Sequence, residues 1–296
     1  MLSQNFMLEK DPLSLERIRQ ILVRLEDTII FDLIERAQFA HNPRIYIRGS
    51  FQELRDMEFD GSWLEWFLKR LKLSMVPRAR RYTSPDEYPF TSNLPVPVLL
   101  PLAFPKILQP NTINANPSIL SFYTRSIVPR ITRRATLALA AIKRSNGIIG
   151  DEEYEDDGNY GSAATIDVEV LQAISKRVHY GKFVSESKFL ENPAAFIPHI
   201  LTPNPTALEA LVTKPEVERK LLQRLRKKAA TYAQEFSADG EAIVNSHLNG
   251  GAKIDVDGVV ELYESYIIPL TKEVEVDYLL HRLDGLSQEE IDALAA

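Results

Sequence analysis

Arg177 and Lys188 are the first pair of residues in this sequence whose spacing suggests binding chemistry. Arg177, Gly181, Val184 and Lys188 follow one another at steps of four, three and four residues, so they share one face of a helix. At a rise of 1.5 Å per residue the two cations lie roughly 16 Å apart along the axis. Both side chains are long enough to close on one small anion from opposite ends. Two surface cations that extend into solvent would give the same pattern, so both interpretations stay open.

Thr271 and Glu275 form a second candidate pair, four residues apart on one face of a later helical segment. Glu273 and Asp277 lie on another face of the same segment. The neighbours of the first pair are largely apolar, namely Ile267, Leu270, Val274, Val276 and Leu279. A Glu that pointed inward would have a raised pKa and could act as a hydrogen-bond donor. A helix with solvated acids is the alternative.

Arg19 and Glu218 are weaker candidates. Arg19 falls between the apolar positions Ile18 and Leu22, as an arginine at the edge of a core also would. Glu218 follows Pro215 in the first turn of an expected helix, where acids favour the helix dipole whatever their function.

The elements that must position these residues are helices, because apolar residues recur at three- and four-residue steps nearly everywhere and no alternating strand pattern is present. Pro12 suits the first turn of the first helix, with Asp11 or Ser14 as its cap. The proline-rich stretch from 77 to 117 is expected to be an ordered loop with short helical turns. The expected helices cover residues 12 to 40, 49 to 58, 61 to 76, 117 to 144 with a break near Pro129, 162 to 189, short pieces of 192 to 212, 215 to 234, and 255 to 283 with a kink at Pro269.

This pattern predicts an all-α fold, a single multi-helix bundle-like domain. The last residues carry Ser287 and Glu290 at the spacing of a capping box, which predicts a short terminal helix.

Composition excludes several classes of function. The 296 residues include no cysteine, so thiolate catalysis, disulfides and zinc–thiolate sites are excluded. The five histidines form no metal-binding pattern, and no nucleotide-binding or serine-hydrolase motif is present, so we expect neither a metal nor a cofactor.

Charge and hydropathy argue against nucleic-acid and membrane partners. The net charge is −6, and the basic run from 219 to 228 lacks aromatic residues, so it is interpreted as a solvated helix face. The acidic run DEEYEDDG, from 151 to 158, is interpreted as a solvated loop. We find neither a secretory signal nor an apolar run long enough to span a membrane, and we expect a cytoplasmic protein.

Four segments together resemble the fungal and plant branch of the helical, allosterically regulated chorismate mutases. They occur in the family's order, and the resemblance extends from about residue 12 to 284. The segments are EDTIIFDLIERAQF (26 to 39), RARRYTSPDEYPF (78 to 90), GNYGSAATIDVEVLQAISKRVHYGKFVSESKF (158 to 189) and IIPLTKEVEVDYLLHRL (267 to 283).

The resemblance implies a homodimer that converts chorismate to prephenate on the way to phenylalanine and tyrosine, with inhibition by tyrosine and activation by tryptophan at dimer-interface sites. It implies a domain over residues 12–284 with catalytic and regulatory parts, an N-terminal extension 1–11 and a C-terminal tail 285–296. The implied catalytic set is Arg19, Arg177, Lys188, Glu218, Thr271 and Glu275. The implied effector set is Arg80, Arg81, Asn159, Gly161, Ser162 and Thr165.

Two positions depart from the pattern of the family. Lys214 stands where an Asn that helps to hold the substrate is familiar, and Asp255 stands where a Thr is familiar. Asp can cap a helix as Thr does, but its negative charge could change the coupling between effector binding and activity.

The reaction fits the absence of cofactor motifs, because the rearrangement is unimolecular and needs orientation of the substrate and stabilisation of developing charge. A non-catalytic helical dimer that serves as a regulatory relative is the main alternative. A lyase acting on isochorismate is another, and a nucleic-acid-binding protein is the least favoured.

Overall fold

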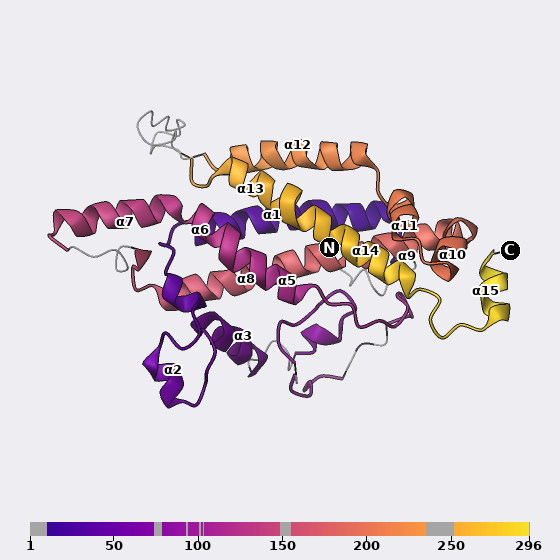
Figure 1. Cartoon of the computed structure of the whole chain (residues 1–296), viewed down its shortest axis with the longest axis horizontal. Coiled ribbons are helices and arrows are strands. Elements are labelled where there is room, and N and C mark those ends of the chain that lie inside the picture. The colour runs from indigo at the N-terminus through magenta and orange to yellow at the C-terminus, as the bar shows by residue number, and fades with distance from the viewer. Residues whose placement is uncertain are drawn as a thin grey trace.

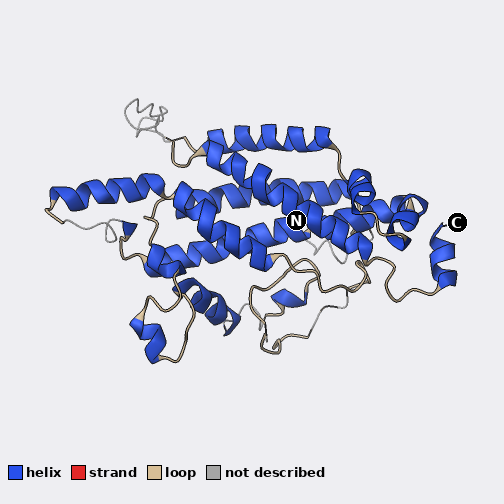
Figure 2. Ribbon diagram, in the orientation of Figure 1, coloured by secondary structure: helices blue, strands red, loops and turns tan. Residues whose placement is uncertain are grey.

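Every helix or strand assigned in the described part of the chain is a helix, as the periodicity predicted (Figure 2). The computed structural model describes residues 11–73, 79–92, 94–100, 102, 104–148, 155–234 and 252–295. The expected N-terminal extension therefore lies almost wholly outside the described residues, as do positions 151–154 of the acidic run.

Six helices that pack on one another form the body of the molecule (Figure 1). They are α1 (Leu15–Arg36), α8 (Tyr160–His179), α9 (Gly181–Glu191), α12 (Pro215–Tyr232), α13 (Val256–Leu262) and α14 (Ile268–Leu280). α1 packs along α8 and reaches α9, α14 packs against α9 and α8, and α12 packs against α13 and α1. This arrangement encloses the candidate site because α1, α8, α9, α12 and α14 each carry one or two of its residues.

Further helices and turns extend the body. The remaining helices are α2 (Gln52–Asp56), α3 (Trp63–Leu73), α5 (Asn116–Phe122), α6 (Val128–Ile131), α7 (Arg133–Ser145), α10 (Pro193–Leu201), α11 (Pro205–Val212) and α15 (Gln288–Ala295). Short 3₁₀ turns span Pro43–Tyr46 and Arg81–Thr83, the second within the predicted proline-rich loop. In Figure 1, α7 projects from one end of the body, and α10, α11 and α15 lie at the other.

Two apolar clusters account for most of the core. The larger joins α1, α3, α5, α8, α12, α13 and α14 through buried side chains such as Ile30, Leu33, Leu171 and Ile174. The smaller joins α9, α10, α11, α14 and α15 through Phe189, Phe196, Leu208, Leu279 and Ile291. Burial of side chains of this size stabilises the fold by roughly 1.5–3 kcal/mol each.

The predicted helix from 162 to 189 is two helices, which corrects the sequence-based prediction. α8 ends at His179, Tyr180 forms a turn, and α9 begins at Gly181. The amide of Phe183 donates to the Tyr180 carbonyl at 3.1 Å, three residues back, which tightens the chain at this point. Arg177 and Lys188 therefore stand on consecutive helices rather than on one continuous face.

Each internal proline that was expected to interrupt a helix follows a π-helical segment. These segments are Tyr123–Ile127 ahead of Pro129 and Tyr263–Ile267 ahead of Pro269. Proline has no amide hydrogen, so the preceding turn must rearrange its hydrogen bonds, and a wider turn is one way to do so. The predicted break near Pro129 falls at Thr132, where α6 gives way to α7, whereas the helical path continues through Pro269 and the kink there stays a prediction.

The first helix is shorter than predicted. It runs from Leu15 to Arg36 rather than from 12 to 40, and Pro12 lies in the preceding turn. Ser14 takes the N-cap position without a side-chain capping hydrogen bond. After Arg36 the chain is no longer helical. The carbonyl groups of Phe39, Ala40 and His41 accept hydrogen bonds from the Arg36 guanidinium instead.

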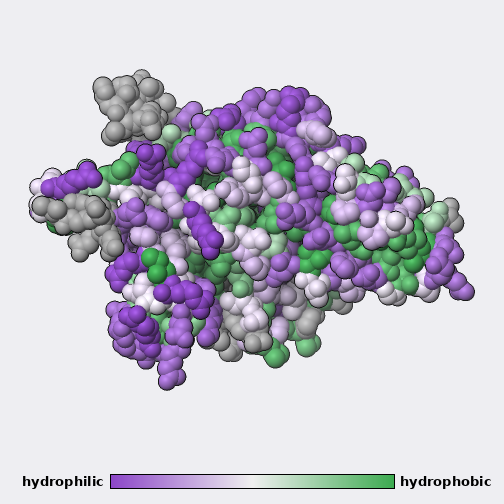
Figure 3. All heavy atoms as spheres, in the orientation of Figure 1, coloured by the Kyte–Doolittle hydropathy of each residue, from purple (hydrophilic) through white to green (hydrophobic). Residues whose placement is uncertain are grey.

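The basic run on α12 is a solvated face with acidic partners. Arg224 and Lys228 pair with Glu26, and Arg226 pairs with Asp257. Figure 3 shows hydrophilic side chains along the outer side of α12. These pairs account for the basic run as a structural feature that joins α12 to α1 and α13.

The tail contains the predicted capping box. The Ser287 amide donates to Glu290 Oε2 at 2.7 Å, and the Glu290 amide donates to Ser287 Oγ at 3.3 Å. α15 then packs on α10 through Ile291. The division into a domain at 12–284 and a tail stays a prediction.

None of the helices in the described residues is both long and apolar enough to cross a bilayer. No three side chains of the types that ligate metals gather there either.

Candidate active site

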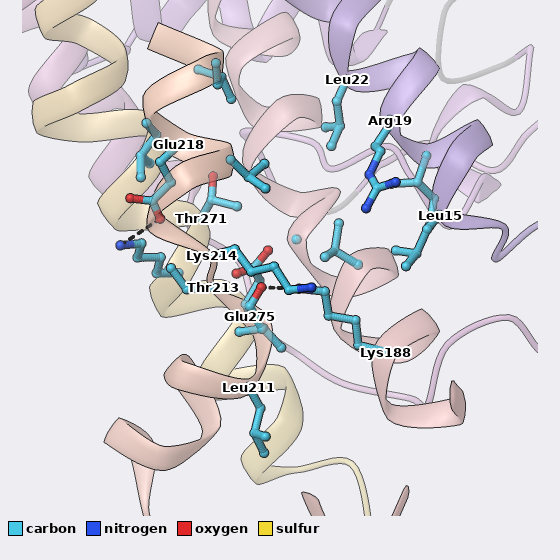
Figure 4. A pocket seen from close by; sticks show the side chains of 18 of the residues that line it. Leu15, Arg19, Leu22, Lys188, Leu211, Thr213, Lys214, Glu218, Thr271 and Glu275 are labelled. Carbon is cyan, nitrogen blue, oxygen red and sulfur yellow. Dashed lines mark hydrogen bonds and ion pairs between the residues drawn. The ribbon is translucent and has the colours of Figure 1, made fainter. Parts of the chain in front are cut away.

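A cavity of about 730 Å³ opens between α1, α8, α9, α12 and α14, and all six predicted catalytic residues line it. Figure 4 labels each of them except Arg177. They come from five helices: Arg19 from α1, Arg177 from α8, Lys188 from α9, Glu218 from α12, and Thr271 and Glu275 from α14. Apolar side chains complete the wall, among them Leu15, Leu22 and Val184.

Arg177 is a buried cation without a compensating partner. Its exposed fraction is 5%. Its Nε has no hydrogen-bond partner, and Arg177 forms no ion pair in the described part of the chain. A buried guanidinium that is left unpaired is costly. An anion in the cavity would offset that cost.

Glu275 and Thr271 project into the cavity one helical turn apart. Both are buried, and burial raises the pKa of Glu275 to about 8, although the positive charges of Lys188 and Arg177 oppose the shift. Glu275 is therefore protonated at neutral pH and can donate a hydrogen bond. The Thr271 hydroxyl donates to the Ile267 carbonyl at 2.6 Å, which leaves its oxygen free to accept.

Gly181 makes this placement possible. A Cβ at position 181 would lie 2.9 Å from Cγ of Glu275 and 3.1 Å from the Thr271 carbonyl oxygen. These separations are shorter than a methyl group tolerates, so any larger residue here would push α14 away from α9. The sequence places Gly181 on the helix face between Arg177 and Lys188, but its contact with α14 depends on the tertiary fold.

Lys188 lies opposite and is half-buried. Burial lowers its pKa, as do the positive charges of Lys214 and Arg19, while Glu275 raises it. Its Nζ donates to the carbonyl of Val212, the last residue of α11. The ammonium is thus held near the carboxyl group of Glu275, and its remaining hydrogens are available to a ligand.

Glu218 has a protein partner that the sequence did not reveal. Lys272 Nζ lies 2.9 Å from Glu218 Oε1 and 3.6 Å from Glu209 Oε1. Lys272 follows Thr271 directly, but the pairing joins α12 to α14, and no spacing in a single sequence encodes it. Arg19, by contrast, is exposed at the edge of the cavity, as Figure 4 shows.

The charge of the cavity suits a small dianion. Five cations line it against three carboxyl groups, one of which is the protonated Glu275. The cations are Arg19, Arg177, Lys188, Lys214 and Lys272, and the carboxyl groups are those of Glu191, Glu218 and Glu275. The arrangement can hold two carboxylates and direct hydrogen-bond donors at an oxygen between them.

The predicted effector residues fall into two groups within one chain. Arg81 pairs with Glu87 at 3.0 Å, and Glu87 also pairs with Lys176 near the end of α8. Arg80 donates to the Leu100 carbonyl nearby. Asn159, Gly161, Ser162 and Thr165 lie at the start of α8. Fifteen residues of helix separate Gly161 from Lys176, roughly 22 Å.

The two positions that depart from the family pattern lie in different surroundings. Asp255 precedes α13 and accepts a hydrogen bond from Arg130 Nε at 2.8 Å, so its charge is compensated. Lys214 lines the cavity at the start of α12.

The family described as "Chorismate mutase type II" matches residues 159–276. A chorismate mutase from Emericella nidulans is 41% identical over 94% of this chain and 95% of its own length. One from Schizosaccharomyces pombe is 39% identical over 93% of this chain and 99% of its own length.

Solved structures give the same result. A chorismate mutase from Candida albicans in complex with L-Trp superposes with a TM-score of 0.80 at 39% identity, covering 98% of this chain and 99% of that one. AtCM1 with tyrosine bound in its allosteric site superposes with a TM-score of 0.73 at 39% identity, covering 93% of this chain and 99% of that one.

Proposed function

The chain belongs to the chorismate mutase family and is an isomerase of that kind, and from this premise we propose that the cavity between α1, α8, α9, α12 and α14 is where chorismate rearranges to prephenate. The reaction breaks one carbon–oxygen bond and forms one carbon–carbon bond within a single molecule. The protein must therefore hold the enolpyruvyl arm over the ring and stabilise negative charge on the ether oxygen as the bond breaks.

Arg19 and Arg177 bind the two carboxylates of chorismate in this proposal. A guanidinium stays charged and can bind a carboxylate through two parallel hydrogen bonds. Arg177 is buried and Arg19 is exposed, on different helices. Binding by both would fix the arm relative to the ring, because each carboxylate belongs to a different part of the molecule.

Lys188 and Glu275 act on the ether oxygen. Lys188 donates as a cation, and Glu275 donates because burial keeps it protonated at neutral pH. Both donors lie in place before the substrate binds, so they need little rearrangement as charge develops. Glu218 and Thr271 bind the ring hydroxyl as hydrogen-bond acceptors, with Glu218 held in position by Lys272.

The unpaired, buried guanidinium of Arg177 beside a protonated Glu275 is the observation that carries this proposal. The test is loss of the ultraviolet absorbance of chorismate with purified protein, with the product identified as prephenate by its acid-catalysed conversion to phenylpyruvate. Turnover with that product is expected. Absence of turnover at every pH would instead indicate a non-catalytic relative.

We propose that amino acids regulate the activity of this enzyme. The proposal rests on two solved structures similar to this chain, one in complex with L-Trp and one with tyrosine bound in its allosteric site. We expect tyrosine to inhibit this enzyme and tryptophan to activate it. The start of α8 offers free amide groups to a carboxylate, and Arg80 or Arg81 would add a charge-assisted bond. Within one chain the two groups lie too far apart to contact one amino acid.

A homodimer would resolve that separation, because a second copy could bring its Arg80 and Arg81 to the start of α8. Exposed apolar side chains on the projecting helix α7, Leu137 and Ile142, support such an interface. Cytoplasmic residence stays a prediction, since plant relatives carry names that place them in the chloroplast.

A further inference from the structure

The C-terminal helix α15 follows the part of the chain that resembles the family. The family match ends at residue 276 and the resemblance of the sequence at about 284, whereas α15 begins at Gln288. The helix nevertheless folds back on the body, where it packs on α10 more extensively than on any other helix (Figure 1). Among the residues of α15 only Ile291 is buried. The tail therefore adds an apolar contact to the body that the family resemblance does not explain.

Ile291 completes an apolar cluster whose other side forms part of the cavity wall. The cluster also contains Phe196 of α10 and Val212 of α11, and both of these residues line the cavity. α10 packs in turn on α9 and α11, so a displacement of α10 would reach both helices. A close-packed interior transmits such a displacement because it contains few voids. The packing of α15 is thus connected to the cavity through α10.

Val212 also holds one of the candidate catalytic groups. Its carbonyl accepts a hydrogen bond from Lys188 Nζ, and it is the one acceptor that the described residues offer to this ammonium. Val212 ends α11, and the chain continues at Thr213 in an extended conformation. The place of this carbonyl therefore depends on where α11 lies, and α11 is held by α10 and α14. The direction of the Lys188 ammonium depends in this way on the packing of α10 and α11.

The contact between Ile291 and the body is the main apolar anchor of α15. A second cavity, of about 470 Å³, lies between α15, α9 and the segment 106–109. Leu286, Ala293 and Leu294 line it from the tail, so this side of α15 is only partly filled. A single substitution at position 291 should consequently loosen α15 on α10.

We propose that Ile291 is a positioning residue for the rearrangement, which holds α10 and α11 so that the Val212 carbonyl directs Lys188 into the cavity. This inference rests on the proposed function, in which Lys188 donates to the ether oxygen. Ile291 does not line the cavity, so it acts only through other residues. A donor to charge that develops in the transition state must be aligned with that charge, and its misalignment lowers kcat more than it raises KM.

The test compares Ile291→Ala and Ile291→Leu with wild type. Ile291→Ala should lower kcat about fivefold and keep KM within about twofold of wild type, because the shorter side chain loosens α10. Ile291→Leu conserves the side-chain volume and should keep kcat within about twofold of wild type. Leu54→Ala is the matched control, since Leu54 is buried in a different apolar cluster that does not line the cavity. It should lower the unfolding temperature but leave kcat and KM unchanged.

A double-mutant cycle with Lys188→Gln separates positioning from a general loss of stability. Because Ile291 acts through Lys188, adding Ile291→Ala to Lys188→Gln should change kcat by less than about twofold. A further fivefold loss in the double variant on the order of that in the single one, an unchanged kcat in Ile291→Ala, or an equal loss in Leu54→Ala would overturn the inference while leaving the mutase proposal intact. A wild-type protein that does not consume chorismate would overturn the proposed function itself.

Discussion

Two buried arginines, Arg36 at the end of α1 and Arg177 on α8, differ in the hydrogen bonds that satisfy them. Arg36 is fully buried beside Asp167 of α8, with Nε 2.8 Å from Asp167 Oδ1, and its other nitrogens donate to backbone carbonyls and to the hydroxyl of Tyr46. Asp167 in turn accepts from the hydroxyls of Tyr46 and Tyr123. Arg177, ten residues further along α8, has a buried Nε with no partner and faces the cavity.

The difference separates a structural charge from a functional one. A buried charge with every hydrogen bond made holds helices together, and here it fixes α1 and the chain after it on α8. A buried charge with bonds left open is a cost to the free protein unless a ligand makes them. Burial alone does not distinguish these cases, whereas the hydrogen-bond inventory does.

Lys182 and Lys188 also differ in how fully the protein satisfies their hydrogen bonds. Lys182 is buried and donates to the Tyr88 hydroxyl, the Asn111 side chain and the Ile113 carbonyl, so its hydrogens are all used. Burial lowers the pKa of Lys182 to about 7. Its role is to hold the long loop on the α8–α9 junction. Lys188 donates to a single carbonyl and keeps hydrogens for a ligand.

The largest expected effect is on turnover in Arg177→Met. Loss of the buried carboxylate contact should lower kcat/KM for chorismate by about 10³-fold, because orientation and charge binding both fail. Thermal unfolding should occur at the wild-type temperature or above it, since the substitution removes an unpaired buried charge. Arg177→Lys keeps the positive charge but not the planar guanidinium, so its kcat/KM should lie between those of wild type and Arg177→Met.

Arg36→Met should show the opposite pattern. Removing one partner of a buried ion pair leaves Asp167 uncompensated and should lower the free energy of unfolding by about 3–5 kcal/mol. Denaturant titration measures this loss. Turnover per folded molecule should stay within about twofold of wild type. A stable Arg36→Met protein would mean that the hydroxyls of Tyr46 and Tyr123 satisfy Asp167 without the cation.

The protonation of Glu275 gives a pH dependence. Because its pKa is raised to about 8, the donor is present below that pH and is lost as pH rises through it. The kcat/KM of the wild type should therefore be about tenfold lower near pH 9 than on its neutral plateau. Glu275→Gln keeps a hydrogen-bond donor at every pH, so its kcat/KM should not decrease through deprotonation at position 275. Only a decrease caused by deprotonation of Lys188 should remain. If kcat/KM of the wild type did not change between about pH 6 and 9, Glu275 would not be the protonated donor to the ether oxygen.

The smallest expected effect is on regulation. Arg81→Ala should raise the tyrosine concentration that halves activity by about fivefold, because an exposed charged contact contributes modestly. Arg48→Ala is the matched control, since Arg48 is also an exposed arginine paired with a Glu, at 2.8 Å from Glu65. Unchanged inhibition in Arg81→Ala would show that tyrosine binds elsewhere.

The helices, and the faces that carry the candidate residues, could be predicted from local periodicity because amphipathic patterns record which face is buried. Local periodicity indicates neither the interruption at Tyr180 nor the close approach of Gly181 to α14. The pairs Arg36–Asp167 and Glu218–Lys272 join residues far apart in the chain, and no local spacing marks them. Resemblance supplied the catalytic set, and the structure added which of its charges are left unpaired.

Equilibrium binding of prephenate, measured by calorimetry on Arg177→Met and Arg36→Met below their unfolding temperatures, tests most directly whether the unpaired guanidinium is the anion site. We expect Arg36→Met to bind prephenate as wild type does and Arg177→Met to bind at least about 30-fold more weakly, because a hydrogen-bonded charge pair is lost. Wild-type affinity in Arg177→Met, or an equal loss in both variants, would contradict the account.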